Sequence, residues 1–338
     1  MKAVGYRQSL AIDQPESLID VELPEPAVGL HDLLVAVKAV SVNPVDTKVR
    51  MRAGPAPGED VKVLGYDAAG VVKSIGSAVT LFKPGDEVFY AGSIARSGTN
   101  AELHAVDERI AGPKPRSLDF AQASALPLTS ITAWELLFDR FGLVPGDTKR
   151  KGTLLIIGGA GGVGSIMIQL ARKLTGLTVI ASASRPESRK WVLELGAHHA
   201  VDHSKPLADE VRAAGHKQVD FIASLTATDQ HLAQAAEIIA PQGKFGMIDD
   251  PKTFDALLFK RKSVSIHWEF MFTRALFETV DIVAQHELLK HVAQMVDGGQ
   301  IRTTLSARYG AINATNLKRA HALVESGRST GKIVLAGF

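Results

Sequence analysis

Apolar and polar residues alternate with two different periods along the chain, and the period changes near residue 125. Before that point, short alternating runs are interrupted by proline and glycine, as in DLLVAVKAVSVNP (32–44), AAGVVKSIGSAV (68–79) and KPGDEVFYAG (83–92). A period of two between turn residues predicts β-strands. The first 125 residues are therefore expected to form a β-rich unit.

After residue 125, apolar runs of strand length alternate with amphipathic stretches of helix length. The strand-like runs are TLLIIGG (153–159), LTVIASA (177–183), HHAVDHS (198–204), VDFIASL (219–225) and GKFGMID (243–249). This alternation predicts a parallel sheet with helices on both faces. Two helical patterns, 287–296 and 316–326, then precede a closing strand, GKIVLAGF (331–338).

Length and charge narrow the class of protein. At 338 residues the chain exceeds one typical hydrophobic core, so two domains are expected. Apolar residues make up 46% and charged residues 22%, which is ordinary for a globular protein. The net charge is +2 without a basic stripe, so nucleic acid is not an expected partner.

The chain contains no cysteine, which excludes disulfides and zinc-binding thiolates. Its start, MKAVGYRQSL, lacks the apolar core of a signal peptide, so a cytoplasmic location is expected. The uncharged run from Thr153 to Ala171 is long enough to suggest a membrane span. Its glycines cluster in the middle as a turn requires, and no membrane insertion is expected.

Five glycines lie within the seven residues 158–164, between a strand pattern and a helix pattern. Gly159, Gly161 and Gly164 fit the dinucleotide fingerprint G-x-G-x-x-G, in which glycines allow close backbone approach and the helix start faces the pyrophosphate. An ATPase-type loop would need lysine where Ser165 stands. The alternative is a turn that only packs helix on strand. The expected cofactor contacts are Gly159, Ala160, Gly161, Gly162 and Val163.

The end of the next strand indicates which dinucleotide binds. NAD-binding proteins usually place Asp or Glu there, but residues 181–185 read ASASR, and the first carboxylate is Glu187. Ser184 followed by Arg185 suits a 2′-phosphate, because a guanidinium offers a charged fork of donors. NADPH is therefore the expected cofactor. Alternatively, Arg185 caps a surface turn.

Several ordered motifs together resemble the medium-chain dehydrogenase/reductase superfamily, and within it the zinc-free quinone oxidoreductase-like branch. They are SVNPVDTKVR (41–50), LGYDAAGVV (64–72), KPGDEV (83–88), LPLTSITAWE (126–135), GGAGGVG (158–164) and GKIVLAGF (331–338). The resemblance implies an α/β protein with an active-site cleft between two domains. A GroES-like β-rich catalytic domain would span 1–125, completed by 281–338, and a Rossmann domain with a doubly wound parallel sheet would span 126–280.

Zinc-dependent alcohol dehydrogenases of this superfamily hold their metal with Cys, His and Cys. The matching positions here carry Asn43, Tyr66 and Leu128, none of which is a usual zinc ligand. The segment 90–103 also lacks the cysteines of the structural zinc lobe. The resemblance therefore implies an enzyme without a metal site.

Without a metal, hydride transfer is expected to favour quinones or the β-carbon of enones, where charge collects on a distant oxygen. That oxygen needs a hydrogen-bond donor and finally a proton. Tyr66 and the Asn43 amide are the candidate donors, and Lys48 could add positive charge. Alternatively, Tyr66 is a wall residue and solvent delivers the proton.

Five more positions carry cofactor roles by resemblance. Thr132 matches the residue behind the nicotinamide ring, and Leu225 and Thr226 match the loop over the cofactor ribose. Lys332 resembles a basic residue near the phosphates, and His203 one against the adenine. Ordinary explanations remain open: Thr132 bonding its own helix, Lys332 at the surface, and His203 as a satisfied loop residue.

The segment SVSIHWEFMFTR (263–274) begins as a strand and then concentrates large apolar side chains. It could line the substrate cleft, pack a dimer or fill the core. Because the family pairs its outer Rossmann strand across two subunits, a homodimer is expected.

The leading hypothesis is an NADPH-dependent, metal-free reductase of quinones or α,β-unsaturated carbonyls. The alternatives are a zinc-type alcohol dehydrogenase, which the three substituted ligand positions oppose, and a non-catalytic NADPH-binding protein.

Overall fold

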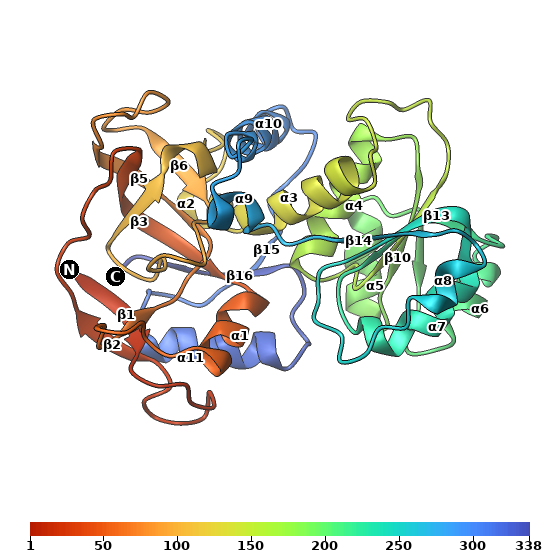
Figure 1. Ribbon diagram of the computed structural model, residues 1–338, viewed down its shortest axis with the longest axis horizontal. Helices are drawn as coiled ribbons and strands as arrows, with labels where there is room; N and C mark the ends of the chain where they lie inside the picture. The colour runs from red at the N-terminus through yellow and green to blue at the C-terminus, as the bar shows by residue number, and fades with distance from the viewer. The chain divides into compact units, whose positions relative to one another are not determined.

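The computed structural model describes residues 1–338 and divides into two compact units (Figure 1). The β-rich unit combines Met1–Ile131 with Phe272–Phe338, and the α/β unit is Thr132–Met271. The C-terminal segment is thus part of the unit that contains the N-terminus. The boundaries expected from the sequence, after residues 125 and 280, differ from these by six residues (131 − 125) and nine residues (280 − 271).

The β-rich unit contains two sheets. The smaller one has the order β2-β1-β4, from β2 (Ile19–Glu22), β1 (Lys2–Tyr6) and β4 (Lys62–Val63). The larger has the order β15-β16-β3-β5-β6-β8, with β7 also paired with β3. Its strands are β3 (Asp32–Val42), β5 (Ala68–Ile75), β6 (Glu87–Tyr90), β7 (Leu103–Asp107), β8 (Ala111–Pro113), β15 (Leu305–Arg308) and β16 (Lys332–Ala336).

The last strand of the chain lies beside the long third strand. In the antiparallel pair β16–β3, Val334 is opposite Ser41 and Ile333 is opposite Val42. This register brings Lys332, at the start of β16, to the end of β3. The two positions are far apart in the sequence, so the pairing creates a contact that no local pattern encodes.

Helices surround these sheets and confirm the two predicted C-terminal helical patterns. The first of these helices is α10 (Ala284–Asp297) and the second is α11 (Ala314–Glu325). Earlier in the chain, α1 (Pro44–Arg52) follows β3 after the single residue Asn43, whose backbone amide donates to the Asp46 carboxylate at 2.8 Å. The shorter helices are η1 (Glu108–Ile110), α2 (Phe120–Ser124) and α9 (Thr273–Phe277).

The α/β unit contains a six-stranded parallel sheet of order β11-β10-β9-β12-β13-β14. Its strands are β9 (Thr153–Ile157), β10 (Thr178–Ser182), β11 (His199–Val201), β12 (Val219–Ser224), β13 (Ile239–Met247) and β14 (Ser265–Trp268). This is the doubly wound arrangement, in which the order of the strands along the sheet reverses between β9 and β12. The predicted parallel sheet is confirmed.

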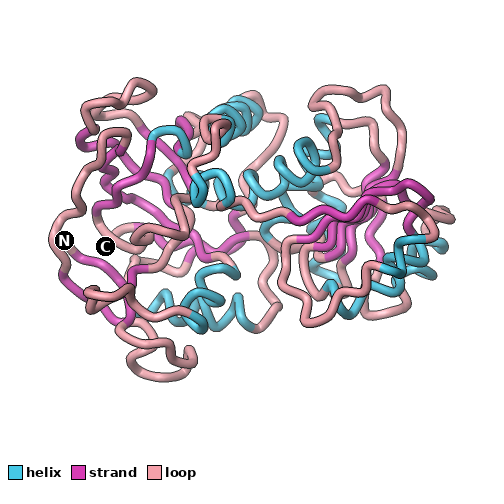
Figure 2. The backbone as a smooth tube through the Cα atoms, in the orientation of Figure 1, coloured by secondary structure: helices cyan, strands magenta, loops and turns pink.

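Helices lie on both sides of this sheet, as Figure 2 shows. They are α4 (Gly162–Leu174), α5 (Pro186–Glu194), α6 (Leu207–Ala213), α7 (Thr228–Ile238) and α8 (Leu257–Lys260). The unit begins within α3 (Pro127–Trp134), which continues into a π-helical segment, η2 (Glu135–Arg140). Fully buried Leu155, Ile222 and Phe245 form part of the apolar core between sheet and helices.

The uncharged run Thr153–Ala171 divides into β9, a glycine turn and most of α4. None of the helices combines the length and apolar character that a membrane span needs.

Candidate functional site

The glycine turn joins the carboxyl end of β9 to the start of α4, at the point where the strand order of the sheet reverses. A side chain on Gly159 would place its Cβ 2.7 Å from the Cβ of Ala181, and one on Gly164 would lie 2.5 Å from the Gly159 carbonyl oxygen. Both positions therefore accept only glycine. No side chain caps α4 at Gly161, so its first amides can face an anion, as the fingerprint predicts.

The Ser182 side chain contacts both this turn and His203, a role that the sequence did not indicate. Its Oγ accepts a hydrogen bond from the Gly158 amide at 3.0 Å and lies 3.1 Å from Nδ1 of His203. Burial lowers the pKa of His203, so its imidazole is neutral at pH 7. His203 thus lies beside the glycine turn, with its ring 6.1 Å from that of His231.

The loop after β12 also contacts the glycine turn. The amide of Leu225 donates to the Ile157 carbonyl at 3.1 Å, and Cγ2 of Thr226 would lie 2.9 Å from a Cβ added to Gly158. Leu225 is half-buried and Thr226 is exposed. The sequence predicts separately that the glycine turn, His203 and this loop contact the cofactor. The structure brings all three together.

Ser184 and Arg185 follow β10, whose last carbonyl, that of Ser182, accepts a hydrogen bond from Gly159. Arg185 is the cap residue before α5, and its Nε lies 2.9 Å from Oε1 of Glu187. The guanidinium therefore pairs with a carboxylate of the first turn of α5 and makes no side-chain cap hydrogen bond to the helix. Since a guanidinium has five donors, this ion pair is compatible with a phosphate contact.

Lys332 has different surroundings from those expected. The residue is 3% exposed, and its ammonium donates to the Val42 carbonyl at 3.1 Å, to Asp67 at 3.0 Å and to the amide oxygen of Asn43. An ammonium has three donors, so these contacts use all of them. We therefore assign Lys332 to a buried polar network rather than to cofactor phosphates or the surface.

Asp67 is the centre of this buried network, and the sequence analysis did not single it out. Its carboxylate accepts hydrogen bonds from Ser41 Oγ at 2.7 Å, Asn43 Nδ2 at 2.7 Å and the Leu128 amide at 2.8 Å, besides the Lys332 ammonium. A buried carboxylate is stable only with such partners. The network therefore joins the ends of β3 and β16, the chain before β5 and the start of α3.

The predicted donor Asn43 belongs to the same network. Its side-chain nitrogen donates to Asp67 and its side-chain oxygen accepts from Lys332, and the residue is 1% exposed. These contacts orient the amide within the protein. The structure therefore supports a positioning role for Asn43, and the direct donor role expected from the sequence stays a prediction.

Tyr66 is also buried, at 1% exposure, but its hydroxyl has no hydrogen-bond partner. Its ring packs edge-to-face on Phe272, with centroids 5.4 Å apart. Burial raises the pKa of the phenol above its usual value, and the nearby Asp46 carboxyl raises it further. The hydroxyl thus keeps its proton at neutral pH and remains a donor.

Asp46 holds the backbone on both sides of this region. Its carboxylate accepts from the Asn43 amide at 2.8 Å and from the Gly65 amide at 3.0 Å. Burial raises the pKa of this carboxyl to about 7. Asp46 therefore holds Gly65, the residue before Tyr66, in place. The only signal for Asp46 in the sequence is its position three residues after Asn43, the N-cap residue of α1.

The remaining two candidates lie on helices. Thr132 is buried in α3, at 4% exposure, and Lys48 is half-buried in α1. Their predicted roles, behind the nicotinamide ring and as a source of positive charge, remain proposals.

Comparison with known proteins identifies the family. Residues 29–116 match the model of the alcohol dehydrogenase GroES-like domain, and residues 195–335 match that of the zinc-binding dehydrogenases. A zinc-type alcohol dehydrogenase-like protein from Staphylococcus epidermidis is 38% identical over 99% of both chains. The chain belongs to the medium-chain dehydrogenase/reductase superfamily.

Solved structures and a plant relative place it in the quinone oxidoreductase-like branch. A structure from Rhizobium etli, assigned to the zinc-dependent alcohol dehydrogenases, is 60% identical, with a TM-score of 0.95 over 100% of this chain and 98% of the other. A quinone oxidoreductase from Pseudomonas syringae is 26% identical, with a TM-score of 0.82 over 99% of both chains. An NADPH-dependent alkenal/one oxidoreductase from Arabidopsis thaliana is 28% identical over 99% of this chain and 79% of its own.

Several of these names mention zinc, but the residues at the corresponding positions do not suit it. Leu128 has an apolar side chain, and the Asn43 amide is held by Asp67 and Lys332. The cation beside Asp67 is the Lys332 ammonium, which would repel a metal ion. No group of three or more His, Cys, Asp or Glu side chains in the chain could hold one. A zinc ion does not fit this network.

Proposed function

We propose that the protein is an NADPH-dependent oxidoreductase that reduces quinones or α,β-unsaturated carbonyls without a catalytic metal. The observation that carries this proposal is the Tyr66 hydroxyl, which is buried and makes no hydrogen bond to the protein. A buried donor without an acceptor costs about 1–3 kcal/mol, and an acceptor oxygen of a substrate would recover that cost. By the resemblance of its motif GYD (65–67), Tyr66 would take the position of a metal ligand of the zinc-dependent relatives.

The cofactor would supply a hydride to the substrate. The glycine turn and the first amides of α4 would hold the pyrophosphate, while Ser184 and Arg185 would bind the 2′-phosphate. His203, Leu225 and Thr226 lie around the same turn and would contact the adenosine half. Thr132 would lie behind the nicotinamide ring.

The protein's part in the chemistry is to stabilise charge on the acceptor oxygen. The Tyr66 hydroxyl, which keeps its proton at neutral pH, would donate to that oxygen as it becomes negative. The network of Asp67, Asn43 and Lys332 would keep the surrounding backbone in place, and Lys48 would add positive charge. Quinones and enones need no stronger electrophile than such a donor, in contrast to simple ketones.

The relatives support this substrate class. The quinone oxidoreductase from P. syringae and the alkenal/one oxidoreductase from A. thaliana both carry such acceptors in their names, and the latter is NADPH-dependent. Steady-state oxidation of NADPH and NADH with a panel of quinones, enones and saturated ketones tests the proposal. Turnover of quinones or enones with NADPH would support it. Tight NADPH binding without turnover of any acceptor would favour the non-catalytic alternative.

Replacing Arg185 by alanine should weaken NADPH binding by about ten- to a hundredfold and leave NADH binding nearly unchanged. The reason is that one charge-assisted contact to the 2′-phosphate is worth roughly 1.5–3 kcal/mol. Fluorescence titration of both cofactors measures the effect. Glu187→Gln is the matched control, because it breaks the same ion pair and keeps the guanidinium. Equal losses for NADPH and NADH would contradict the assignment.

Exhaustive treatment with a chelator should leave activity and melting temperature unchanged, because the chain offers neither thiolates nor a cluster of metal-binding side chains. Metal analysis of the purified protein before and after treatment checks that removal is complete. Stoichiometric zinc whose loss abolishes turnover would revive the alcohol dehydrogenase alternative.

We also propose a homodimer formed through β14, the outer strand of the parallel sheet. The aromatic segment that begins at its last residue, Trp268, is only partly buried: Met271 and Phe272 are buried, whereas Trp268 is 57% and Phe270 46% exposed. An open strand edge with exposed aromatic side chains suits pairing with a second copy. Sedimentation should show a dimer, and Trp268→Lys should shift it to monomer. An unchanged sedimentation coefficient in the variant would place the interface elsewhere.

A further inference from the structure

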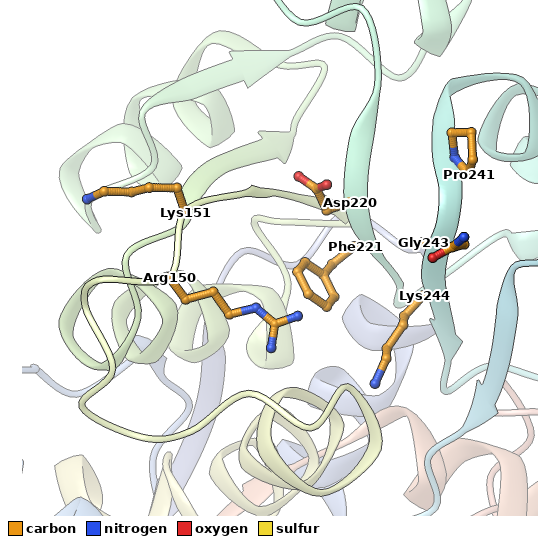
Figure 3. A pocket seen from close by; sticks show the side chains of 8 residues that line it. Arg150, Lys151, Asp220, Phe221, Pro241, Gly243 and Lys244 are labelled. Atoms are coloured by element: carbon orange, nitrogen blue, oxygen red, sulfur yellow. The ribbon is translucent and has the colours of Figure 1, made fainter.

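A cavity of about 130 Å³ opens at the amino ends of β9, β12 and β13, at the opposite edge of the sheet from the glycine turn. For comparison, a protein cavity of about 150 Å³ can hold benzene. Its walls come from the loop before β9 and the starts of the other two strands (Figure 3). The proposed function uses none of these residues.

The wall contributed by β13 is an irregular segment. Ile239 pairs with Val219 and Lys244 pairs with Phe221, so the four residues 240–243 face the single residue Asp220 of β12. Within this bulge Gln242 has a left-handed backbone, with φ of +61°. Bulges and left-handed residues other than glycine are costly and are concentrated at sites where a side chain must be re-aimed.

The bulge ends at Lys244, which together with Arg150 supplies the charge of the cavity. Figure 3 shows the Arg150 guanidinium and the Lys244 ammonium directed toward the same space beside the Phe221 ring, whereas Lys151 points away. The guanidinium lies over the Phe221 ring, 5.4 Å from its centroid, and the ammonium donates to the Phe141 carbonyl at 2.8 Å. Both contacts fix the direction of a cation without neutralising it.

No carboxylate pairs with either cation. The carboxylate in the cavity wall, that of Asp220, accepts a hydrogen bond from the Thr153 amide at 2.7 Å and forms no ion pair with Arg150 or Lys244. Two positive groups held toward one space repel each other unless an anion lies between them. A guanidinium and an ammonium together offer the donors that carboxylate and phosphate oxygens accept.

We propose that this cavity binds a compact oxyanion, either a carboxylate or a phosphate group, between Arg150 and Lys244. Such a site is separate from the cofactor and would allow a small anionic metabolite to bind while the glycine turn is occupied. The Phe221 ring gives the site an apolar wall, against which the carbon part of an organic anion can rest. The proposal does not depend on the proposed function.

The test is calorimetric titration of the full chain with inorganic phosphate and, separately, with benzoate at low ionic strength. One saturable site is expected for at least one probe, and the probe that binds identifies the source of the oxyanion. Arg150→Gln and Lys244→Gln should each weaken binding tenfold or more. Lys149→Gln is the matched control, since it removes the same charge from an exposed neighbour that does not line the cavity.

Arg185→Ala is included because phosphate could also enter the proposed 2′-phosphate site. Binding that is retained in Lys149→Gln and Arg185→Ala but lost in Arg150→Gln would support the proposal. Three results would overturn it: no saturable binding of either probe, equal losses in Arg150→Gln and Lys149→Gln, or loss in Arg185→Ala alone. Lys244→Gln also removes the hydrogen bond from Lys244 to the Phe141 carbonyl. If this variant has a lower melting temperature, the test of the proposal rests on Arg150→Gln, because Arg150 is exposed.

Discussion

Replacing Tyr66 by phenylalanine should lower the rate of enone reduction by about ten- to a thousandfold, the range that follows from loss of one oriented donor to an oxyanion. The affinity for NADPH should barely change, because the phenol is assigned to the substrate oxygen. Quinones accept charge more readily, so their reduction should fall less. Steady-state kinetics with one enone and one quinone measure both effects.

The matched control is Tyr6→Phe, which removes a buried hydroxyl from the same unit. The Tyr6 hydroxyl donates to the Ala53 carbonyl at 2.6 Å, whereas that of Tyr66 has no partner. Loss of the Tyr6 bond should reduce the free energy of unfolding by about 1 kcal/mol without slowing turnover. Tyr66→Phe should show the reverse: slower turnover and undiminished stability. If the Tyr66 variant reduces enones at the parent rate, the tyrosine is only a wall residue, and ordered water becomes the better candidate.

The cofactor half of the candidate site could be predicted from the sequence because its constraints are local. Gly159 and Gly164 are spaced by the geometry of one turn and one helix start, where a Cβ would meet Ala181 or the backbone. The parallel sheet was equally accessible, since strand and helix alternate regularly along the chain. The short spacing from the turn to Arg185 follows from one helix and one strand.

The network around Asp67 could not be predicted, because its members come from distant parts of the sequence. Ser41, Leu128 and Lys332 meet Asp67 only through the pairing of β16 with β3 and through the start of α3. A buried lysine and a surface lysine look the same in the letters GKIVL. Sequence reasoning therefore assigned Lys332 to phosphates by resemblance, where long-range pairing gives it a carboxylate partner.

The same limitation applies to Ser182 and the cavity near Arg150. In the sequence Ser182 is one of several small residues at a strand end, and only the parallel register places its hydroxyl beside the Gly158 amide. The bulge of residues 240–243 depends on the match between two strands. Pro241 and Gly243 indicate an interruption there, but they do not show what the segment pairs with. The sequence thus predicts the helices and strands, but it does not predict the contacts between them.

Replacing Asp67 by asparagine should lower the free energy of unfolding of the β-rich unit by about 3–5 kcal/mol, one of the largest effects expected in this chain. Asp67 is fully buried, and its Oδ2 lies 3.0 Å from the Lys332 ammonium. Asparagine keeps the volume but leaves that ammonium buried without a counter-charge, which is far costlier than losing a surface pair. All four tyrosines lie in the β-rich unit and all three tryptophans in the α/β unit. The near-ultraviolet circular dichroism of tyrosine, recorded during urea unfolding, therefore measures the unfolding of the β-rich unit.

Asp119→Asn provides the control, because Asp119 pairs with Arg308 at 2.6 Å while both side chains are about half exposed. Asparagine can also replace the aspartate as cap of α2, so this variant should lose less than about 1 kcal/mol. Adding Lys332→Met to Asp67→Asn removes the stranded charge, and the double variant should be destabilised by less than the sum of the two single changes. If the Asp67 variant is no less stable than the Asp119 control, the prediction is wrong, and the Lys332 ammonium must be able to reach solvent when Asp67 is replaced. In that case Lys332 would again be available to the cofactor phosphates.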